Sequence, residues 1–432
     1  MANPKNSVPA QSPGWRIVRN GGWLLGGKTV GAILSVVYLA MITRSLGPEG
    51  FGRFALTFSF AQAVGGLISF QTGQIIIRYG TPLVLKKADD DFAQLIWICL
   101  MMDTLGVIAG SGLTVLCVLG LSVYYGWGIQ IIIQIIVFTV VMLLATRGTS
   151  IGILRVHDRF RDAALADTLV PIIRFAGVGV GLLFGPTIIW FLAIWVMSEI
   201  TATAIMWAVI WRTVPIRLAQ QRIRSIPEYY RKYPDLTRFA GFTNLTSSLR
   251  IMSQQIIVLV VGFYAGAAAA GFFRLGHQLG QVLARIADGL SFTVFAEYNR
   301  ITNQDGAHAA RSMIGNTMRV TLISAAILLM ILTLSGKYLI TKIFGVAYLP
   351  AYPLVLLLGG AAAVQVGAMA LEPVLITHGK AGWVLLCNLA GAVTMALLLI
   401  ILMPTYSVVG AGIAVVSGAL ITALFLSAIY RR

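Results

Sequence analysis

Residues 129–147 read IQIIIQIIVFTVVMLLATR, an apolar run in which the first ionised side chain is the last residue. A helix needs about 20 consecutive apolar residues to cross the hydrocarbon core of a bilayer. Similar runs lie on both sides of this one, and twelve in all have spanning length: 19–44, 51–77, 92–120, 129–147, 163–184, 188–211, 239–263, 268–290, 313–336, 351–376, 383–403 and 408–430. The sequence therefore predicts an all-α polytopic membrane protein with about twelve transmembrane helices.

The composition favours an exterior that faces lipid. Of the 432 residues, 58% are hydrophobic and 11% are charged, whereas a soluble domain carries about 25% charged residues. The first residues, MANPKNSVPAQSPGWR, are polar and lack the apolar core of a signal peptide. We therefore expect residues 1–18 to form a cytosolic tail.

The cysteines and histidines suggest no metal site. Cys99, Cys117 and Cys387 lie in apolar runs without the spacing of metal ligands, and the four histidines are scattered. Such cysteines are typical of small buried hydrophobic side chains. The sequence contains no P-loop either, so we expect no metal and no cofactor.

The excess of basic residues indicates the orientation in the membrane. There are 32 Lys and Arg against 15 Asp and Glu, a net charge of +17. The basic residues gather in one set of loops, at 86–87, 155–161, 212–238, 300–311, 380 and 431–432, while the alternate loops at 124–128, 185–187, 265–271 and 404–410 carry none. Cytoplasmic loops of membrane proteins are enriched in Lys and Arg. This pattern predicts that both termini are cytoplasmic and removes the need for a nucleic-acid partner; its exceptions are Arg44, Arg53, Lys337 and Lys342.

The longest loop predicts two lobes. A basic cytosolic linker at 212–238 would separate an N-lobe, 19–211, from a C-lobe, 239–432, with six helices each. The sequence G-F-x-R occurs at 50–53 and again at 271–274, in each case at the turn between the first two helices of a lobe. Since both lobes start on the cytoplasmic side, the halves are expected to be parallel repeats.

Basic side chains inside the spans are the main functional candidates, because an ionised group at a helix centre costs at least about 2.5–3.5 kcal/mol. In 268–290, polar residues recur at spacings of three and four, which places them on one helix face beside water or beside partner side chains. In 239–263, Arg250 lies near mid-membrane, and Lys28 lies within one position of its equivalent in the first lobe. The candidate substrate-binding residues are Lys28, Arg250, Arg274, His277, Gln281 and Arg285.

A second set of residues has weaker support. Arg53, Arg78 and Gln254 are secondary candidates for the same lining, and Asp288, Glu372 and Asp103 are candidates for ion coupling. Asp167 and Arg174, two turns apart around Pro171, are predicted to form a structural pair. The predicted lining is net positive, and guanidinium groups match phosphate oxygens, so the cargo is expected to be anionic.

Several segments resemble one family of transporters. RSLGPEGFGRFAL at 44–56, after a first helix that contains NGGWLLGGKTV, is similar to the start of the Wzx-type polysaccharide flippases, in the polysaccharide transport branch of the MOP superfamily. IFGVAYLPAYPLVLLL at 343–358 and PTYSVVGAGIAVVSGAL at 404–420 resemble later parts of the same family. The Gln254-Gln255 pair departs from it, because many relatives carry an acidic residue there, which puts ion coupling at this helix in doubt.

The resemblance implies a MATE-like fold with two six-helix lobes around a central cavity that opens alternately to each side. It implies a flippase that moves undecaprenyl-pyrophosphate-linked oligosaccharide from the cytoplasmic to the periplasmic leaflet of a bacterial inner membrane, for lipopolysaccharide or exopolysaccharide synthesis. The partners implied are the lipid-linked anionic oligosaccharide, membrane lipids and other polysaccharide-assembly proteins. Its cationic luminal residues would match Lys28, Arg250, Arg274 and Arg285.

Two alternatives stay open. A MATE-type ion-coupled exporter of small molecules would share the architecture, but it should show carboxylates where basic residues dominate here. A membrane-embedded polysaccharide polymerase or ligase would need catalytic residues in an outward loop. The longest such loop, about 337–350, contains no Asp, Glu or His. We therefore expect a transporter and not an enzyme.

Overall fold

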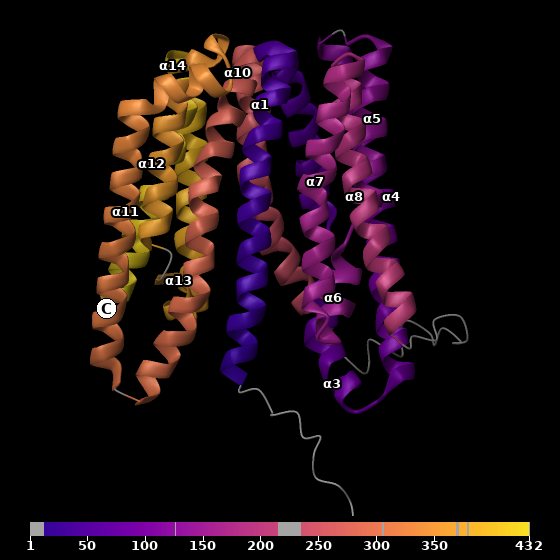
Figure 1. The fold of residues 1–432 in the computed structure, drawn as a ribbon, viewed down its shortest axis with the longest axis vertical. Helices are drawn as coiled ribbons and strands as arrows, with labels where there is room; N and C mark the ends of the chain where they lie inside the picture. Colours follow the sequence, from indigo (N-terminus) through magenta and orange to yellow (C-terminus); the bar gives the residue numbers. More distant parts are fainter. Residues whose placement is uncertain are drawn as a thin grey trace, which may run out of the picture. The chain divides into compact units, whose positions relative to one another are not determined.

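The computed structural model describes residues 13–125, 127–214, 235–304, 306–368, 371–377 and 380–431, and all regular elements in these ranges are helices (Figure 1). In chain order they are α1 (Pro13–Ile68), α2 (Thr72–Ile75), the π-helix η1 (Ile76–Gly80), α3 (Thr81–Leu85), α4 (Asp89–Tyr125), α5 (Ile129–Leu144), α6 (Gly148–Val156), α7 (Phe160–Phe184), α8 (Ile188–Thr213), α10 (Leu236–Gln304), α11 (Gly306–Ile343), the 3-10 helix η3 (Val346–Ala351), α12 (Tyr352–Ala368), α13 (Leu371–Thr377) and α14 (Ala381–Arg431).

The helices confirm an all-α polytopic membrane fold. Within the described side chains, eight helical stretches are long and apolar enough to cross a membrane. Two of them, Gly31–Leu85 and Gly382–Tyr430, contain 55 and 49 residues. Since a 20-residue helix already spans about 30 Å, each of these is long enough for more than one crossing. The number of twelve spans stays a prediction.

Glycines break the two longest helices. α1 is kinked at Gly47 (φ 65°, ψ 178°), and α10 is kinked at Gly266 (φ 85°, ψ 174°). This combination of a positive φ with an extended ψ is essentially restricted to glycine. The two kinks lie at the turns for which the sequence predicts a repeat, so both turns start from the same backbone conformation.

The two turns also pack against one another. A Cβ atom on Gly52 would overlap the carbonyl oxygen of Ala267, and one on Gly271 would lie 2.9 Å from the carbonyl oxygen of Pro48. Only glycine allows the two backbones to approach this closely. The contact therefore depends on glycines within the repeated segments themselves.

Aromatic rings pack around the two glycine-containing turns. The ring centroid of Tyr348, in η3, lies 6.2 Å from that of Phe51 and 5.9 Å from that of Phe272. The buried Tyr348 hydroxyl donates a hydrogen bond of 3.1 Å to the carbonyl oxygen of Thr43. Offset and edge-to-face aromatic pairs of this spacing stabilise packing. Three turns that are distant in the sequence thus share one core.

Arg44 and Arg53, two exceptions to the predicted charge pattern, have local partners. The guanidinium of Arg44 donates to the carbonyl oxygens of Ile343 (2.9 Å) and Lys342, at the end of α11. Carbonyl groups in the last turn of a helix lack partners within the helix, and cations stabilise that end. Arg53 forms a 2.7 Å ion pair with Glu49, in which both side chains are more than half exposed. Neither residue therefore contradicts the predicted orientation.

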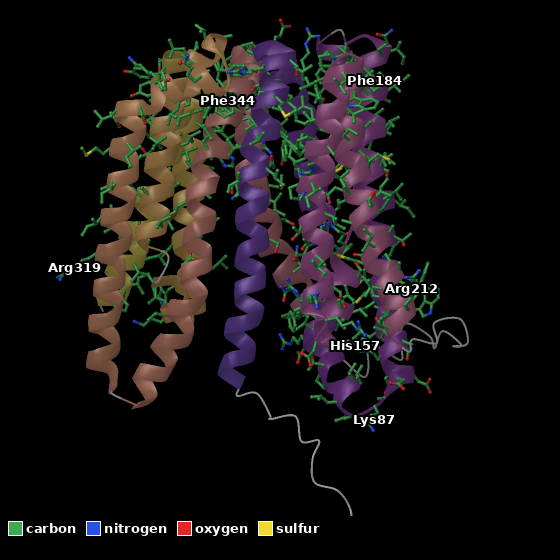
Figure 2. The ribbon with its side chains drawn as sticks, viewed as in Figure 1. Lys87, His157, Phe184, Arg212, Arg319 and Phe344 are labelled. Atoms are coloured by element: carbon green, nitrogen blue, oxygen red, sulfur yellow. The ribbon has the colours of Figure 1, made fainter. Side chains whose placement is uncertain are left out.

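The chain forms two compact units. The first contains the described residues up to Tyr38 together with Val64–Val180 and Leu192–Leu249, and the second contains Leu39–Ala63, Gly181–Phe191 and the residues from Arg250 onward. In the first unit, the labelled residues Lys87, His157 and Arg212 lie toward the same end (Figure 2). The basic loops are predicted to lie on one side of the membrane and to alternate with loops on the other side, and this arrangement agrees with that pattern. The side of the membrane that this end faces, and the predicted lobes, stay predictions. Most of the predicted linker, residues 215–234, lies outside the described residues.

Candidate functional site: polar clusters within the spanning helices

The predicted polar stripe begins at Arg274, in the part of α10 that follows the Gly266 kink. Arg274 is partly buried and donates a hydrogen bond of 3.3 Å from Nη1 to Oε1 of Gln255. Its guanidinium carbon lies 4.9 Å from the centroid of the Phe58 ring, within the range of a cation–π interaction. The amide and the ring fix the position of the guanidinium inside a spanning segment, Ser247–Gly280.

His277 lies one turn further along the same helix face. Its ring stacks against that of Phe273, with centroids 6.3 Å apart and planes inclined by 15°. Arg274 and His277 thus lie one turn apart in α10, and Gln255 is the hydrogen-bond partner of Arg274; their role in binding stays a prediction. Gln254, the predicted secondary candidate, is only partly buried, whereas Gln255 is 9% exposed. Adjacent glutamines differ by about 100° around a helix, and only the packed partner shows which one faces inward.

Four other primary candidates and one ion-coupling candidate, Asp288, are only partly described. Lys28 lies in α1, and Arg250, Gln281, Arg285 and Asp288 lie in α10, but their side chains are outside the described residues. They stay candidates by their position in the sequence.

Two of the secondary candidates face different surroundings. Arg53 forms the exposed ion pair with Glu49 and so has a local partner. Arg78 lies in η1, with its guanidinium carbon 4.2 Å from the Phe239 ring centroid and 5.5 Å from that of Tyr79. Both aromatic contacts lie within the first unit, and they give Arg78 a structural role in packing η1 against the start of α10.

A charged network in the first unit was predicted only in part. Arg147 forms ion pairs of 2.6 Å with both Asp167 and Glu199, and Arg174 forms one of 2.7 Å with Glu199. The predicted pair of Asp167 with Arg174 is wrong, because Asp167 pairs with Arg147 and Arg174 pairs with Glu199. Asp167 and Arg174 are seven residues apart and therefore about 10 Å apart along the axis of α7. At this separation each of the two side chains pairs with a residue outside α7. Arg147 is the last residue of the predicted span 129–147 and is not among the predicted functional or pairing residues.

Three of the four side chains of this network are largely shielded from solvent, whereas Asp167 is 53% exposed. The side chains of Arg147, Arg174 and Glu199 are 21%, 13% and 15% exposed. Arg174 also donates from Nε to the Ser198 hydroxyl (2.9 Å) and lies with its guanidinium carbon 4.4 Å from the centroid of the Trp195 ring. Two arginines are matched by two carboxylates, so this cluster is suited to joining α6, α7 and α8 and less to binding an anion.

Asp103, a predicted ion-coupling candidate, is held by hydroxyl groups. Thr72 donates to its two carboxylate oxygens at 3.1 and 3.2 Å, and Thr149 donates to Oδ2 at 2.6 Å. These residues come from three elements, α2, α4 and α6. The three side chains form the Asp103 cluster.

Glu372 has a neutral partner. In α13, its carboxylate accepts a hydrogen bond of 3.1 Å from the Asn388 amide of α14. Among the described residues, no group of three or more His, Cys, Asp or Glu side chains is arranged to hold a metal ion.

Comparison with solved structures shows which known folds this chain resembles. The structure matches the lipid II flippase MurJ in its inward closed conformation with a TM-score of 0.74 and 13% identity, over 95% of this chain and 87% of MurJ. It matches a multidrug resistance MATE transporter of the MOP superfamily, in an inward-facing conformation, with a TM-score of 0.73 and 13% identity, over 93% of this chain and 94% of that chain. A MOP superfamily transporter from Pyrococcus furiosus Vc1 (DSM3638), described as having a binding pocket of reversed polarity, gives 0.64 and 14%, over 96% and 95%. The MATE-like fold is confirmed.

Sequence comparison identifies the family. The inner membrane protein YghQ of Escherichia coli (strain K12) is 26% identical over 349 residues, which cover 78% of this chain and 95% of YghQ. A model of the family described as "Polysaccharide biosynthesis protein" matches residues 17–295. The resemblance to polysaccharide flippases is thus confirmed at the level of the family. Since the match extends over more than half of the chain, this protein belongs to the polysaccharide biosynthesis protein family.

Proposed function

We propose that this protein is a flippase that moves an undecaprenyl-pyrophosphate-linked oligosaccharide from the cytoplasmic to the periplasmic leaflet of a bacterial inner membrane. Alternating access of a MATE-like fold would carry the repeat unit across for surface polysaccharide synthesis. The family supports a role in polysaccharide biosynthesis, and the Escherichia coli relative is an inner membrane protein. The fold is shared with MurJ, a flippase of another lipid-linked sugar, lipid II.

The observation that carries the proposal is the placement of Arg274. A guanidinium inside a spanning helix costs at least about 2.5–3.5 kcal/mol, so an arginine there usually has a partner or a functional role. Gln255 and Phe58 orient this one, and a planar guanidinium binds phosphate oxygens through two parallel hydrogen bonds. Arg285 lies eleven residues further along, within about 20° of the same helix face. Arg274 would receive the pyrophosphate group, and Arg285, about 16 Å further along the helix axis, would meet the anionic cargo at a second point.

The Arg274→Gln and Arg285→Gln variants test the proposal in a strain from which the gene is deleted. Each substitution removes a charge-assisted interaction worth about 1.5–3 kcal/mol, so export should fall by about tenfold or more. Surface polysaccharide should decrease while the lipid-linked repeat unit accumulates in the cytoplasmic leaflet. Arg274→Lys keeps the positive charge but cannot form the two parallel hydrogen bonds of a guanidinium, so its export activity should lie between those of the natural sequence and Arg274→Gln.

Arg212→Gln is the matched control, because Arg212 lies exposed in the last turn of α8. The variants must reach the membrane in equal amounts, as measured by immunoblot. If the Arg274→Gln/Arg285→Gln double variant restores full export, the proposed anionic site is wrong.

A MATE-type exporter is the second candidate, because MATE structures share the fold. It predicts that drug resistance, and not surface polysaccharide, depends on the protein. An enzymatic role has no comparable support: the matched folds are those of transporters. Drug sensitivity of the deletion strain separates the two transport functions.

A further inference from the structure

Carboxylate and amide side chains are rare in the last part of the chain. After Asn316 the sequence contains three Asp, Glu, Asn or Gln residues, which are Gln365, Glu372 and Asn388. Gln365 is exposed on α12, and the structure brings the other two together. Nδ2 of Asn388, in α14, donates a hydrogen bond of 3.1 Å to Oε1 of Glu372, in α13. Ionisable and polar groups within spanning segments are costly and usually mark a wet cavity or a substrate site.

The packing of α13 on α14 holds this pair in position. α13 contains seven residues, fewer than an isolated helix needs to be stable in water, so its position depends on its neighbours. Leu371 and Cys387, which precede Glu372 and Asn388 in the chain, are 1% and 2% exposed and belong to one apolar cluster. The backbone beside each polar side chain is therefore fixed before a ligand arrives, which lowers the entropic cost of binding.

The pair keeps hydrogen-bonding groups that a ligand can use. Asn388 is exposed and Glu372 is partly exposed. Among the described residues, no Lys, Arg or His forms an ion pair with Glu372, and the hydrogen bond between the two residues uses one N–H and one carboxylate oxygen. A carboxylate accepts several hydrogen bonds, and an amide both donates and accepts. An acceptor thus lies next to a group that offers a further N–H and a carbonyl oxygen.

We propose that Glu372 and Asn388 bind hydroxyl groups of the glycan on the lipid-linked cargo and help to determine which sugars are accepted. A hydroxyl group both donates and accepts hydrogen bonds, so neighbouring sugar hydroxyls match a carboxylate beside an amide. The carboxylate would repel phosphate oxygens, which excludes the pyrophosphate group as the ligand of this pair. The inference rests on the proposed function, in which Arg274 receives the pyrophosphate.

The position of the pair along the helix suits the head group of such a cargo. Asn388 lies seven residues, or about 10 Å, from the start of α14 at Ala381. The preceding loop, at Lys380, is predicted to be cytoplasmic, which puts the pair in the inner half of the membrane. A glycan that enters from the cytoplasmic leaflet would meet it there. Arg274 belongs to the same compact unit, so one unit offers a base for phosphate and a neutral-ligand site for sugar.

Binding to the purified full chain in lipid nanodiscs separates the two parts of the cargo. The probes are the undecaprenyl-pyrophosphate-linked oligosaccharide extracted from the deletion strain and undecaprenyl pyrophosphate without sugar, and tryptophan fluorescence gives both affinities. The natural sequence should bind the sugar-bearing carrier more tightly. Asn388→Leu should lower this ratio of affinities about tenfold and leave the affinity for the bare carrier unchanged, whereas Arg274→Gln should weaken both. Thr394→Val is the matched control on α14, because its hydroxyl bonds within the helix to the carbonyl oxygen of Ala390, and it should keep the ratio.

Glu372→Gln covers the case in which Asn388→Leu does not fold, because it keeps the size of the side chain. It should lower the ratio severalfold, since hydrogen bonds to a neutral amide are about half as strong as those to a carboxylate. If the folded variants keep the ratio of the natural sequence, the pair is only a structural contact between α13 and α14, and the inference is wrong. Equal binding of the two carriers by the natural sequence also overturns it but leaves the proposed function in place. If the natural sequence binds neither carrier, the proposed function fails and this inference fails with it.

Discussion

Glu199 forms ion pairs with two arginines at once, so its substitution should destabilise the first unit. Its two carboxylate oxygens accept from Arg147 and Arg174, at 2.6 and 2.7 Å. All three side chains are largely shielded from solvent, so the charges interact in a medium of lower dielectric than water. The loss of one member leaves the others with an uncompensated charge.

Glu199→Gln should therefore lower the free energy of unfolding by about 3–5 kcal/mol, the usual cost of breaking a buried ion pair. Denaturant titration in detergent, followed by tryptophan fluorescence, measures the change; Trp195 lies beside Arg174 and reports on the site. The control is Asp162→Asn, whose ion pair is about a third exposed and contributes about 0.2–1 kcal/mol. Equal stabilities of the two variants would contradict this view of the network.

At the scale of elements, the turn glycines decide how α1 and α10 meet. Gly52 and Gly271 lie in the repeated G-F-x-R segments, and each faces a backbone carbonyl group of the other turn. A methyl group at either position has no flexible side chain to displace. The repeat is thus an interlocked pair of turns within the second unit.

Gly52→Ala should destabilise the protein by about 1–3 kcal/mol or more, because overpacking forces the backbones apart. Gly112→Ala is the matched control, since a Cβ there meets nothing within 4 Å and α4 is helical at this position. That substitution should be neutral or stabilise by up to about 1 kcal/mol. Thermal midpoints of the two purified variants give the comparison, and a Gly52→Ala midpoint at or above that of Gly112→Ala would show that the turns can separate.

Hydropathy predicted the helical class and the approximate spans but not the interruptions at 69–71 and 145–147. An average over about 20 residues is insensitive to a break of three, and both breaks lie within or at the end of runs that count as apolar. Helical spacing likewise grouped Arg274 with His277. It could not give the partners of Arg147 or Asp103, because these come from elements distant in the sequence and depend on packing.

At the scale of the whole molecule, the orientation of the chain is a separate prediction. In a background without Cys99, Cys117 and Cys387, a single cysteine is placed at Thr187 or at Lys87. The first should react with a membrane-impermeant maleimide in intact cells, and the second only after permeabilisation, because basic loops stay cytoplasmic. The reverse pattern would invert the proposed direction of transport.

Residues 39–63 belong to the second unit, but they are synthesised well before the rest of that unit. This segment leaves the ribosome long before Arg250, where the main part of its unit begins. At about 5–20 residues per second, roughly 190 intervening residues delay its partners by about 10–40 s. During that interval a kinked, glycine-containing segment must reside in lipid or beside the insertion machinery, without the partners that later pack against it in the second unit.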